Sequence, residues 1–254
     1  MIDIHAHILP ALDDGSNDLE ESLEMARMAV AEGIHTVIAT PHHRNGQYDN
    51  EAEQVQEAVR FLQEQLEVHE IPLKVSPGQE IRGYSDLLRD WESGGLLTLA
   101  GSSYLLLEFP AGEVPRHARE WIYELGIFGV TAVIAHPERN KELAGNFHAL
   151  AELIEAGALA QVTSHSLTGA FGRSIQKTSI QMCNSRLIHF VASDAHNLRT
   201  RPFALKEAYN SLAKETSQEV ADTCKRNASL LIDHEPIPYQ EPRLARKRLF
   251  FFNK

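Results

Sequence analysis

Histidines and carboxylates stand at or just beyond the ends of short apolar runs. The chain opens with a run that ends in His5 and His7, and Asp14 follows a few residues later. The same pattern recurs far along the chain at His42, Glu80, Glu108, His136, Asp194 and His196. Neutral imidazoles mixed with carboxylates are ligands that zinc, manganese and iron prefer. These nine groups exceed what one tetrahedral ion uses, so we expect two to three divalent metals, with Glu80 as a bridging carboxylate.

Each of these motifs alone also has an ordinary structural explanation. The histidine pair could be a satisfied polar pair, and Asp194 could cap a helix. Glu108 is the hardest to explain in this way, because it lies in the apolar run LLLEFP and a buried charge must be paired or bound to a metal. The combination, more than any single motif, indicates a metal site.

Short β-branched runs alternate with amphipathic helical patterns along the chain. The runs predict strands at residues 2–5, 35–40, 73–78, 104–109, 131–136, 159–164 and 188–193. Helical spacing predicts helices near residues 19–33, 50–69, 114–126, 146–157 and 203–215. This alternation predicts an α/β fold with parallel strands, either a barrel or a wound sheet. In a parallel barrel the carboxyl ends of the strands share one face, which would gather the histidines and carboxylates.

Length and charge limit the classes of protein to consider. The chain has 254 residues and a net charge of −11, which suits a single α/β domain and argues against nucleic acid as a general partner. Its cysteines, Cys183 and Cys224, form no metal-binding or disulfide pattern, which favours a reducing compartment. The first residues do not resemble a signal peptide, and no apolar stretch approaches the ~20 residues of a membrane helix. We therefore expect a cytoplasmic protein.

The composition changes after Ile232. Three prolines precede a basic run that ends in three phenylalanines. We expect a barrel domain over residues 1–235 and a basic, aromatic tail over residues 236–254. The tail either packs back on the barrel as a strap or docks on a membrane surface or a partner protein.

Two arginines are candidates for binding a substrate anion. Arg139 and Arg201 lie beyond two of the predicted ligand-bearing strands, and a guanidinium can hold phosphate with two parallel hydrogen bonds. Arg199 is an alternative in the same loop, and an ion pair at the barrel rim would explain any of them without a substrate. Metals in such a site activate water and clamp phosphate oxygens, which favours phosphate ester hydrolysis. The chain has no Cys-x5-Arg, Gly-x-Ser-x-Gly or Walker motif, so those mechanisms are excluded.

The ordered motifs DIHAH, LDDG, TPHH, GQE, LLEFP, AHPERN and ASDAHN resemble the PHP (polymerase and histidinol phosphatase) superfamily. More narrowly, they resemble the manganese-dependent protein tyrosine phosphatases of bacterial capsule and exopolysaccharide loci, from residue 1 to about residue 235. The resemblance implies a distorted (β/α)7, TIM-like barrel with a trinuclear site, most often Mn²⁺, with Fe or Zn as alternatives. It implies that the nine residues above are ligands and that Arg139 and Arg201 hold phosphate. The implied substrate is the phosphotyrosine cluster on the C-terminal tail of a bacterial tyrosine kinase.

Two further histidines bear on this interpretation. A phenolate leaving group has a pKa near ~10 and needs only modest protonation, for which His43 is a candidate. His165 departs from the resemblance, because a small residue is expected there, and it bears on the width of the substrate pocket.

Other functions remain open at this point. A small-molecule phosphoesterase such as a histidinol phosphatase would use the same scaffold. An amidohydrolase shares the His-x-His motif, but that class normally has a modified lysine where this chain has Glu108. A metal-stabilised regulatory or docking protein is the alternative outside the enzymes, and the tail is its best support.

Overall fold

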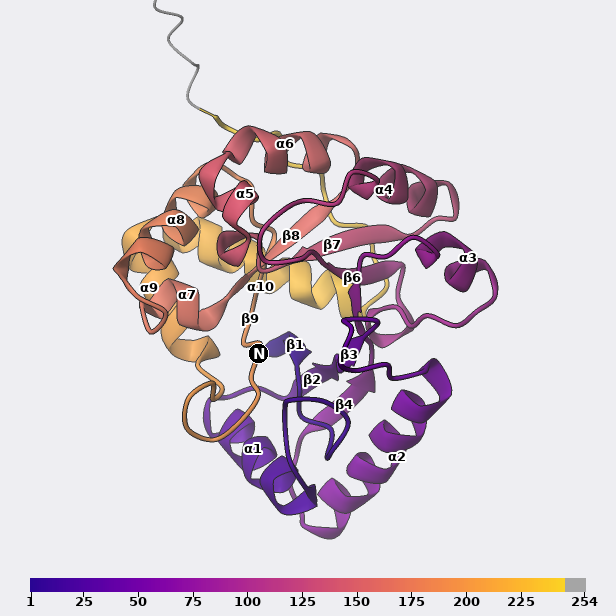
Figure 1. Ribbon diagram of the computed structural model, residues 1–254. Helices are drawn as coiled ribbons and strands as arrows, with labels where there is room; N and C mark the ends of the chain where they lie inside the picture. The colour runs from indigo at the N-terminus through magenta and orange to yellow at the C-terminus, as the bar shows by residue number, and fades with distance from the viewer. Residues whose placement is uncertain (245–254) are drawn as a thin grey trace, which may run out of the picture.

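The strands of the computed structural model, which describes residues 1–244, lie in two parallel sheets that together form a ring (Figure 1). One sheet contains β1 (Ile2–Ala6), β2 (Thr36–Ala39) and β4 (Lys74–Pro77) in that order. The second contains, in order, β3 (His42–His43), β5 (Glu80–Arg82), β6 (Tyr104–Glu108), β7 (Thr131–Ala135), β8 (Leu159–Thr163) and β9 (Phe190–Ala192). Each pairing between these described strands is parallel.

The two sheets join because two strands are interrupted and the ring closes beyond β9. Residues 40–41 separate β2 from β3, and residues 78–79 separate β4 from β5. Pro41 has no N–H to donate, which accounts for one of the interruptions. At the closure, Asp194 N donates to His5 O and His7 N donates to Ala195 O, both at 2.8 Å. Counting each interrupted strand once, the described chain forms the predicted distorted (β/α)7 barrel.

The predicted strands match the observed ones to within two residues at each end. Five predicted helices correspond to α1 (Leu19–Ala31), α2 (Ala52–Val68), α4 (Ala118–Ile127), α6 (Phe147–Glu155) and α9 (Leu205–Glu215). The prediction for α4 began too early, because Pro115 and its neighbours form a turn in which Ala118 N donates to Pro115 O. Helical spacing did not predict the remaining helices, which are α3 (Leu87–Glu92), α5 (Lys141–Gly145), α7 (Ser164–Thr168), α8 (Arg173–Asn184), α10 (Gln218–Ile232) and the short 3-10 turns η1 (Leu99–Gly101) and η2 (Pro137–Arg139).

Apolar side chains fill the barrel from one end only. Ile4, Val133 and Phe190 point into the barrel interior and pack against Ala228 and Leu231 of α10. Figure 1 shows α10 behind the strands, across the end of the barrel where they begin. A larger apolar layer lies between the outer strand surface and the surrounding helices. Because α10 closes the amino end of the barrel, polar residues are left to the opposite, carboxyl end.

The described part of the C-terminal tail follows the barrel surface. Tyr104 donates its hydroxyl to Glu235 O at 3.1 Å and accepts from Ile237 N at 2.9 Å, and Arg243 N donates to Ser185 O at 2.8 Å. This part is a strap, while the run of phenylalanines expected to pack or dock lies outside the described residues. No helix within residues 1–244 combines the length and apolar character needed to cross a membrane.

Candidate metal centre

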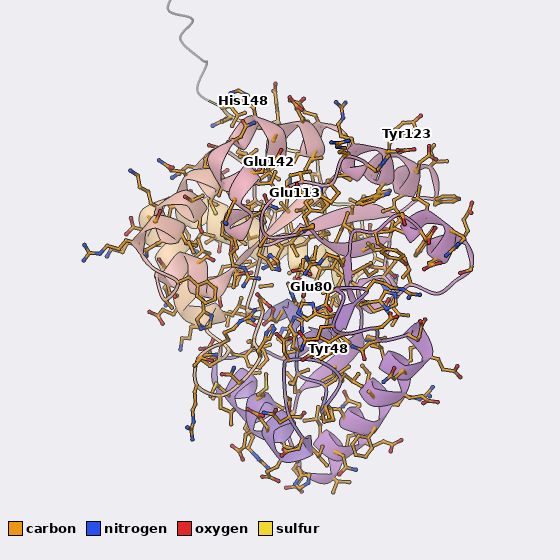
Figure 2. The ribbon with its side chains drawn as sticks, in the orientation of Figure 1. Tyr48, Glu80, Glu113, Tyr123, Glu142 and His148 are labelled. Atoms are coloured by element: carbon orange, nitrogen blue, oxygen red, sulfur yellow. The ribbon has the colours of Figure 1, made fainter. Side chains whose placement is uncertain are left out.

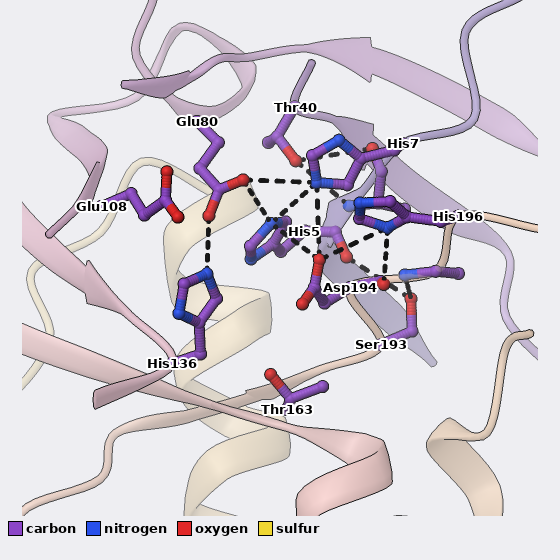
Figure 3. Close-up of polar contacts among 12 residues, drawn as sticks. His5, His7, Thr40, Glu80, Glu108, His136, Thr163, Ser193, Asp194 and His196 are labelled. Carbon is purple, nitrogen blue, oxygen red and sulfur yellow. Dashed lines mark hydrogen bonds and ion pairs between the residues drawn. The ribbon is translucent and has the colours of Figure 1, made fainter. Parts of the chain in front are cut away.

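The structure brings all nine predicted ligands together at the carboxyl ends of the strands. Figure 2 shows Glu80 near the centre of the barrel mouth, and Figure 3 shows it between His136 and the pair His5 and His7. Each of the nine has an imidazole nitrogen or carboxylate oxygen within 3.9 Å of another member of the set. The nine side chains therefore lie together at one end of the barrel, and their role as ligands stays a prediction.

Two of these residues have backbone conformations that favour glycine. His136 has φ 33° and Asp194 has φ 54°, both in the left-handed region. A non-glycine residue held there costs about 1–3 kcal/mol, so the surrounding structure must impose it. His136 directly follows β7 and Asp194 lies two residues beyond β9, where the sharp turn directs each side chain into the barrel mouth.

Partners on the far side of each ring fix how His5 and His7 are oriented. His7 Nδ1 lies 2.6 Å from Asp13 Oδ2, and His5 Nδ1 lies 3.0 Å from Gln161 Oε1. A carboxylate or amide oxygen only accepts, so in each neutral ring Nδ1 carries the hydrogen and Nε2 carries a lone pair. Both Nε2 atoms are therefore available as ligand atoms.

These lone pairs meet other acceptors at one point. The Nε2 atoms of His5 and His7 are 3.2 Å apart, and each lies 3.4 Å from Glu80 Oε2 and from Asp194 Oδ1. Neither carboxylate oxygen has a hydrogen-bond partner among the described residues, although both are buried. When both rings are neutral, these four atoms are acceptors without a donor between them, and they repel one another unless a proton or a metal ion lies among them. The donor set therefore fits a divalent metal ion.

Glu80 connects this point to a second group of ligands. Its other oxygen, Oε1, lies 2.7 Å from His136 Nε2, and Oε2 also lies 2.9 Å from His42 Nδ1. Glu108 Oε2 lies 3.9 Å from the same His42 nitrogen and 2.9 Å from Arg82 Nη2. Glu80 Oε1 therefore faces His136, while Oε2 faces both the first group and His42. Its role as a bridging carboxylate stays a prediction.

A third group lies on the side of the loop that follows β1. Asp14 Oδ1 is 3.4 Å from His42 Nε2 and 3.4 Å from His196 Nε2. His196 Nδ1 is 3.0 Å from the backbone oxygen of Asp194, so its Nε2 is left with a lone pair. His7, Asp14, His42 and His196 together form a set of ligand atoms close enough to share one ion.

The charges of the cluster shift its pKa values strongly. Burial opposes the charged form of His42, but Glu80 and Asp14 raise its pKa to about 10. Burial likewise opposes ionisation of Glu80, yet His5 and His42 hold its pKa well below 4.5. Burial and the charge of Glu80 raise the pKa of Glu108 to about 7. The cluster thus holds more negative charge than its arginines compensate, and protons and divalent cations compete for it.

Both predicted phosphate-binding arginines face the cluster. Arg139 Nη2 lies 2.9 Å and Arg201 Nη2 2.5 Å from Asp194 Oδ2, and both side chains are about three-quarters buried. The Asp194 oxygens nonetheless lack partners of hydrogen-bond geometry within the described residues, so these contacts are ion pairs. Two guanidinium groups therefore stand at one edge of the ligand set.

His43 does not belong to this cluster. Its Nδ1 lies 3.2 Å from Asp49 Oδ1 and its ring lies edge-on to Tyr84 at 6.5 Å. Successive strand residues point to opposite faces, so His42 takes the inner face of β3 and His43 the outer face. Within residues 1–244, no contact of His43 supports its predicted role in leaving-group protonation.

Three residues that were not predicted from the sequence support the ligands. Asp13 orients His7, Gln161 orients His5, and Arg82 compensates Glu108. A signal for Gln161 was present, because it is a polar residue within the apolar strand run LAQVT. Nothing in the sequence distinguishes the role of Asp13 from that of its neighbour Asp14.

A (β/α)7 barrel with a cluster of histidines and carboxylates at the carboxyl ends of its strands is the arrangement expected of the PHP superfamily. Residues 1–233 match the family described as "Capsular polysaccharide synthesis, CpsB/CapC". The chain belongs to the CpsB/CapC family.

Individual relatives cover nearly the whole chain. It is 48% identical over 251 residues to tyrosine-protein phosphatase YwqE of Bacillus subtilis (strain 168), with 99% of each chain covered. It is 33% identical to tyrosine-protein phosphatase CpsB of Streptococcus pneumoniae, covering 85% of this chain and 90% of the relative. A solved structure described among those of YwqE from B. subtilis and CpsB from S. pneumoniae, "unique metal-dependent tyrosine phosphatases", has a TM-score of 0.94, 48% identity and coverage of 97% and 100%.

Proposed function

We propose that this protein is a metal-dependent protein tyrosine phosphatase, a phosphoric monoester hydrolase that acts on phosphotyrosine. The observation that carries the proposal is the convergence of His5 Nε2, His7 Nε2, Glu80 Oε2 and Asp194 Oδ1 without a donor between them, next to two arginines. Membership of the CpsB/CapC family and the named activity of its relatives support the reaction class.

Three sets of ligand atoms each lie close enough together to share one ion, which supports two to three ions. They are His5, His7 and Glu80; His42, Glu80 and Glu108; and His7, Asp14, His42 and His196. The two remaining predicted ligands adjoin these sets, because Asp194 Oδ1 lies 3.4 Å from the Nε2 atoms of His5 and His7, and His136 Nε2 lies 2.7 Å from Glu80 Oε1. Imidazole mixed with carboxylate oxygen accepts Mn²⁺, Fe or Zn, and the resemblance to manganese-dependent phosphatases favours Mn²⁺ among them. When bound, such ions lower the pKa of water and neutralise charge on phosphate oxygens.

The protein's own contribution is to bind and orient the phosphate. Arg139 and Arg201 already point toward the ligand set, where their guanidinium groups can each offer two parallel N–H donors to phosphate oxygens. Donors fixed in this way stabilise the charge that develops on the transferring phosphoryl group. A phenolate leaves with a pKa near ~10, so the reaction makes little demand for a strong general acid.

A more specific proposal concerns the physiological substrate. The family description concerns capsular polysaccharide synthesis, which supports a phosphotyrosine protein of such a locus as substrate, namely the C-terminal tail of a bacterial tyrosine kinase. Such a tail would place the enzyme in the cytoplasm, as the sequence predicts. The division into a barrel over residues 1–235 and a tail over residues 236–254, which would serve a membrane or partner contact, is also proposed.

One side-by-side assay tests the activity and its alternatives. The protein is stripped with a chelator, reconstituted with Mn²⁺, Fe²⁺ or Zn²⁺, and assayed on a phosphotyrosine peptide, a phosphoserine peptide and histidinol phosphate. We expect hydrolysis that depends on added metal and favours phosphotyrosine. Preference for histidinol phosphate would instead support a small-molecule phosphoesterase. A metal-loaded protein that hydrolyses none of the three would support a regulatory or docking role.

A further inference from the structure

A cavity of about 570 Å³ opens beside the two arginines. Arg139 and Arg201 line it, and the same guanidinium groups contact Asp194 of the ligand set. Its remaining wall is largely apolar and includes Phe171 and Ile175. A cavity of this volume is within the range of small-ligand sites, which are usually apolar with a few well-placed polar groups.

The ring of Phe171 is held in place by its neighbours. Phe171 lies between α7 and α8, and its N–H donates to His165 O at 3.4 Å. The Phe171 ring stacks on the His165 ring at 5.4 Å with an interplanar angle of 27°, and Arg139 Cζ lies 5.7 Å from the Phe171 centroid. Phe171 is nevertheless only half-buried, so part of an oriented aromatic face remains open to the cavity.

We propose that this cavity binds the aryl ring of phosphotyrosine and that Phe171 and Ile175 select aryl over alkyl phosphates. The inference rests on the proposed function and adds the residues that read the substrate. Phosphotyrosine joins an anionic phosphate to a flat apolar ring. The cavity places the two guanidinium groups beside an apolar wall, and Glu138, Asn140 and Lys141 complete its lining. Phosphate held by Arg139 and Arg201 places the ester oxygen, and hence the ring, at the cavity mouth. The single methylene of phosphoserine is too short to cover that wall.

His165 has a role in this arrangement. Its contacts are with Ser164 Oγ at 3.3 Å and with the Phe171 ring, and burial lowers its pKa, which keeps the imidazole neutral. A neutral, stacked imidazole supports the ring of Phe171 from behind. The residue that departs from the family pattern therefore shapes the apolar wall.

The test compares Phe171→Ala, Phe171→Leu and Ile175→Ala in the Mn²⁺-reconstituted full chain. Phe61→Ala is the matched control, because Phe61 is 44% exposed and lies on α2. We expect Phe171→Ala to lower kcat/KM for a phosphotyrosine peptide about tenfold, mainly through KM, since an aromatic contact and its buried area are lost. Phe171→Leu and Ile175→Ala should each lower the same kcat/KM about threefold, because each removes only part of the apolar contact area. Hydrolysis of a phosphoserine peptide and inhibition by inorganic phosphate should change by less than about twofold, because neither uses the wall.

Two results would overturn the inference. Equal losses for phosphotyrosine, phosphoserine and inorganic phosphate would mean that Phe171 acts only by positioning Arg139. No loss in any Phe171 or Ile175 variant would mean that the ring binds elsewhere. Calorimetry that compares the affinity for phosphotyrosine with the affinity for inorganic phosphate distinguishes failure of this inference from failure of the proposed function. Tighter binding of phosphotyrosine than of phosphate by the wild type, lost in Phe171→Ala, supports the subsite even in a protein without turnover. Equal binding of the two by the wild type rejects the subsite.

Discussion

Asp13 Oδ2 lies 2.6 Å from Nδ1 of His7 and accepts the backbone N–H of the ligand His42 at 3.0 Å. Its other oxygen accepts the backbone N–H of Gly15 at 2.9 Å. One carboxylate thus orients a ligand ring, the start of a second ligand strand and the loop that carries Asp14. It does so without being one of the predicted ligands.

Replacing Asp13 by alanine should therefore weaken metal binding. Removal of such a supporting partner typically costs 10- to 100-fold in metal affinity, because the ligand ring loses its fixed orientation and tautomer. The affinity is measured by titrating Mn²⁺ into stripped protein and following metal content and activity together. Asp49→Asn is the control, since Asp49 contacts His43 and Arg44 outside the cluster. Equal Mn²⁺ affinity in Asp13→Ala and wild type would contradict the role given to Asp13.

Replacing Arg139 by alanine should affect turnover and leave metal content unchanged. Loss of one fixed donor to a transition-state charge lowers kcat by about 10²–10³-fold. Arg199→Ala is the matched control, because Arg199 is exposed and lies in the loop that also carries Arg201. Metal analysis of the purified variants distinguishes the two effects. If Arg139→Ala lost metal together with activity, its assignment to phosphate would be wrong.

Gly15 is needed where the loop after β1 passes against His7. A Cβ at Gly15 would lie 2.5 Å from the Cβ of His7 and closer still to its carbonyl oxygen, so the backbone must move. We expect Gly15→Ala to destabilise the protein by about 1–3 kcal/mol, the usual cost of forcing atoms into a packed site. It should also lower metal content, because the same loop carries Asp13 and Asp14. Thermal unfolding and metal analysis measure both.

Gly112→Ala is the control for this substitution. A Cβ at Gly112 would have no neighbour within 4 Å, and its φ is not in the left-handed region. An unfolding midpoint and metal content in Gly15→Ala that equal those of Gly112→Ala would show that the loop can move without cost.

A buried histidine away from the metal ligands makes stability depend on pH. Burial lowers the pKa of His189 to about 4 from 6.5, and its Nδ1 accepts the backbone N–H of Ala160 at 3.1 Å. Below pH 6.5 this residue is protonated in the unfolded chain, whereas in the folded protein it stays neutral until about pH 4. Folding stability is therefore unaffected by His189 above pH 6.5 and falls as pH decreases, by about 2 kcal/mol at pH 5.

His189→Asn isolates this effect. The asparagine oxygen can accept the Ala160 N–H but does not titrate in this range. The free energy of unfolding is measured by urea denaturation at pH 7 and pH 5 for both proteins, so that the metal ligands titrate equally in each. We expect the loss between the two pH values to be smaller in His189→Asn. Equal losses would show that His189 does not carry the pH dependence.

The sequence determined which residues could form the site, because of a rule that needs no coordinates. Parallel strands that alternate with helices present their carboxyl ends on one face, so His5, Glu80, Glu108 and Asp194 could be grouped from their places at strand ends. The strand limits followed from the bounds of the short apolar runs. Helices such as α7 and α10 were not identified, and α10 closes the barrel through contacts that join its Ala228 and Leu231 to distant strands.

Only the tertiary structure decided what neighbouring residues of the same type do. Asp13 and Asp14 are adjacent and chemically alike, yet one faces the far nitrogen of His7 and the other faces His42 and His196. His42 and His43 differ in the same way, since alternate strand residues point to opposite faces and the register places His42 inside. Local sequence fixes residue type and spacing. The direction of each side chain depends on where the loop and strand lie in the closed barrel, which is set by packing between segments far apart in the chain.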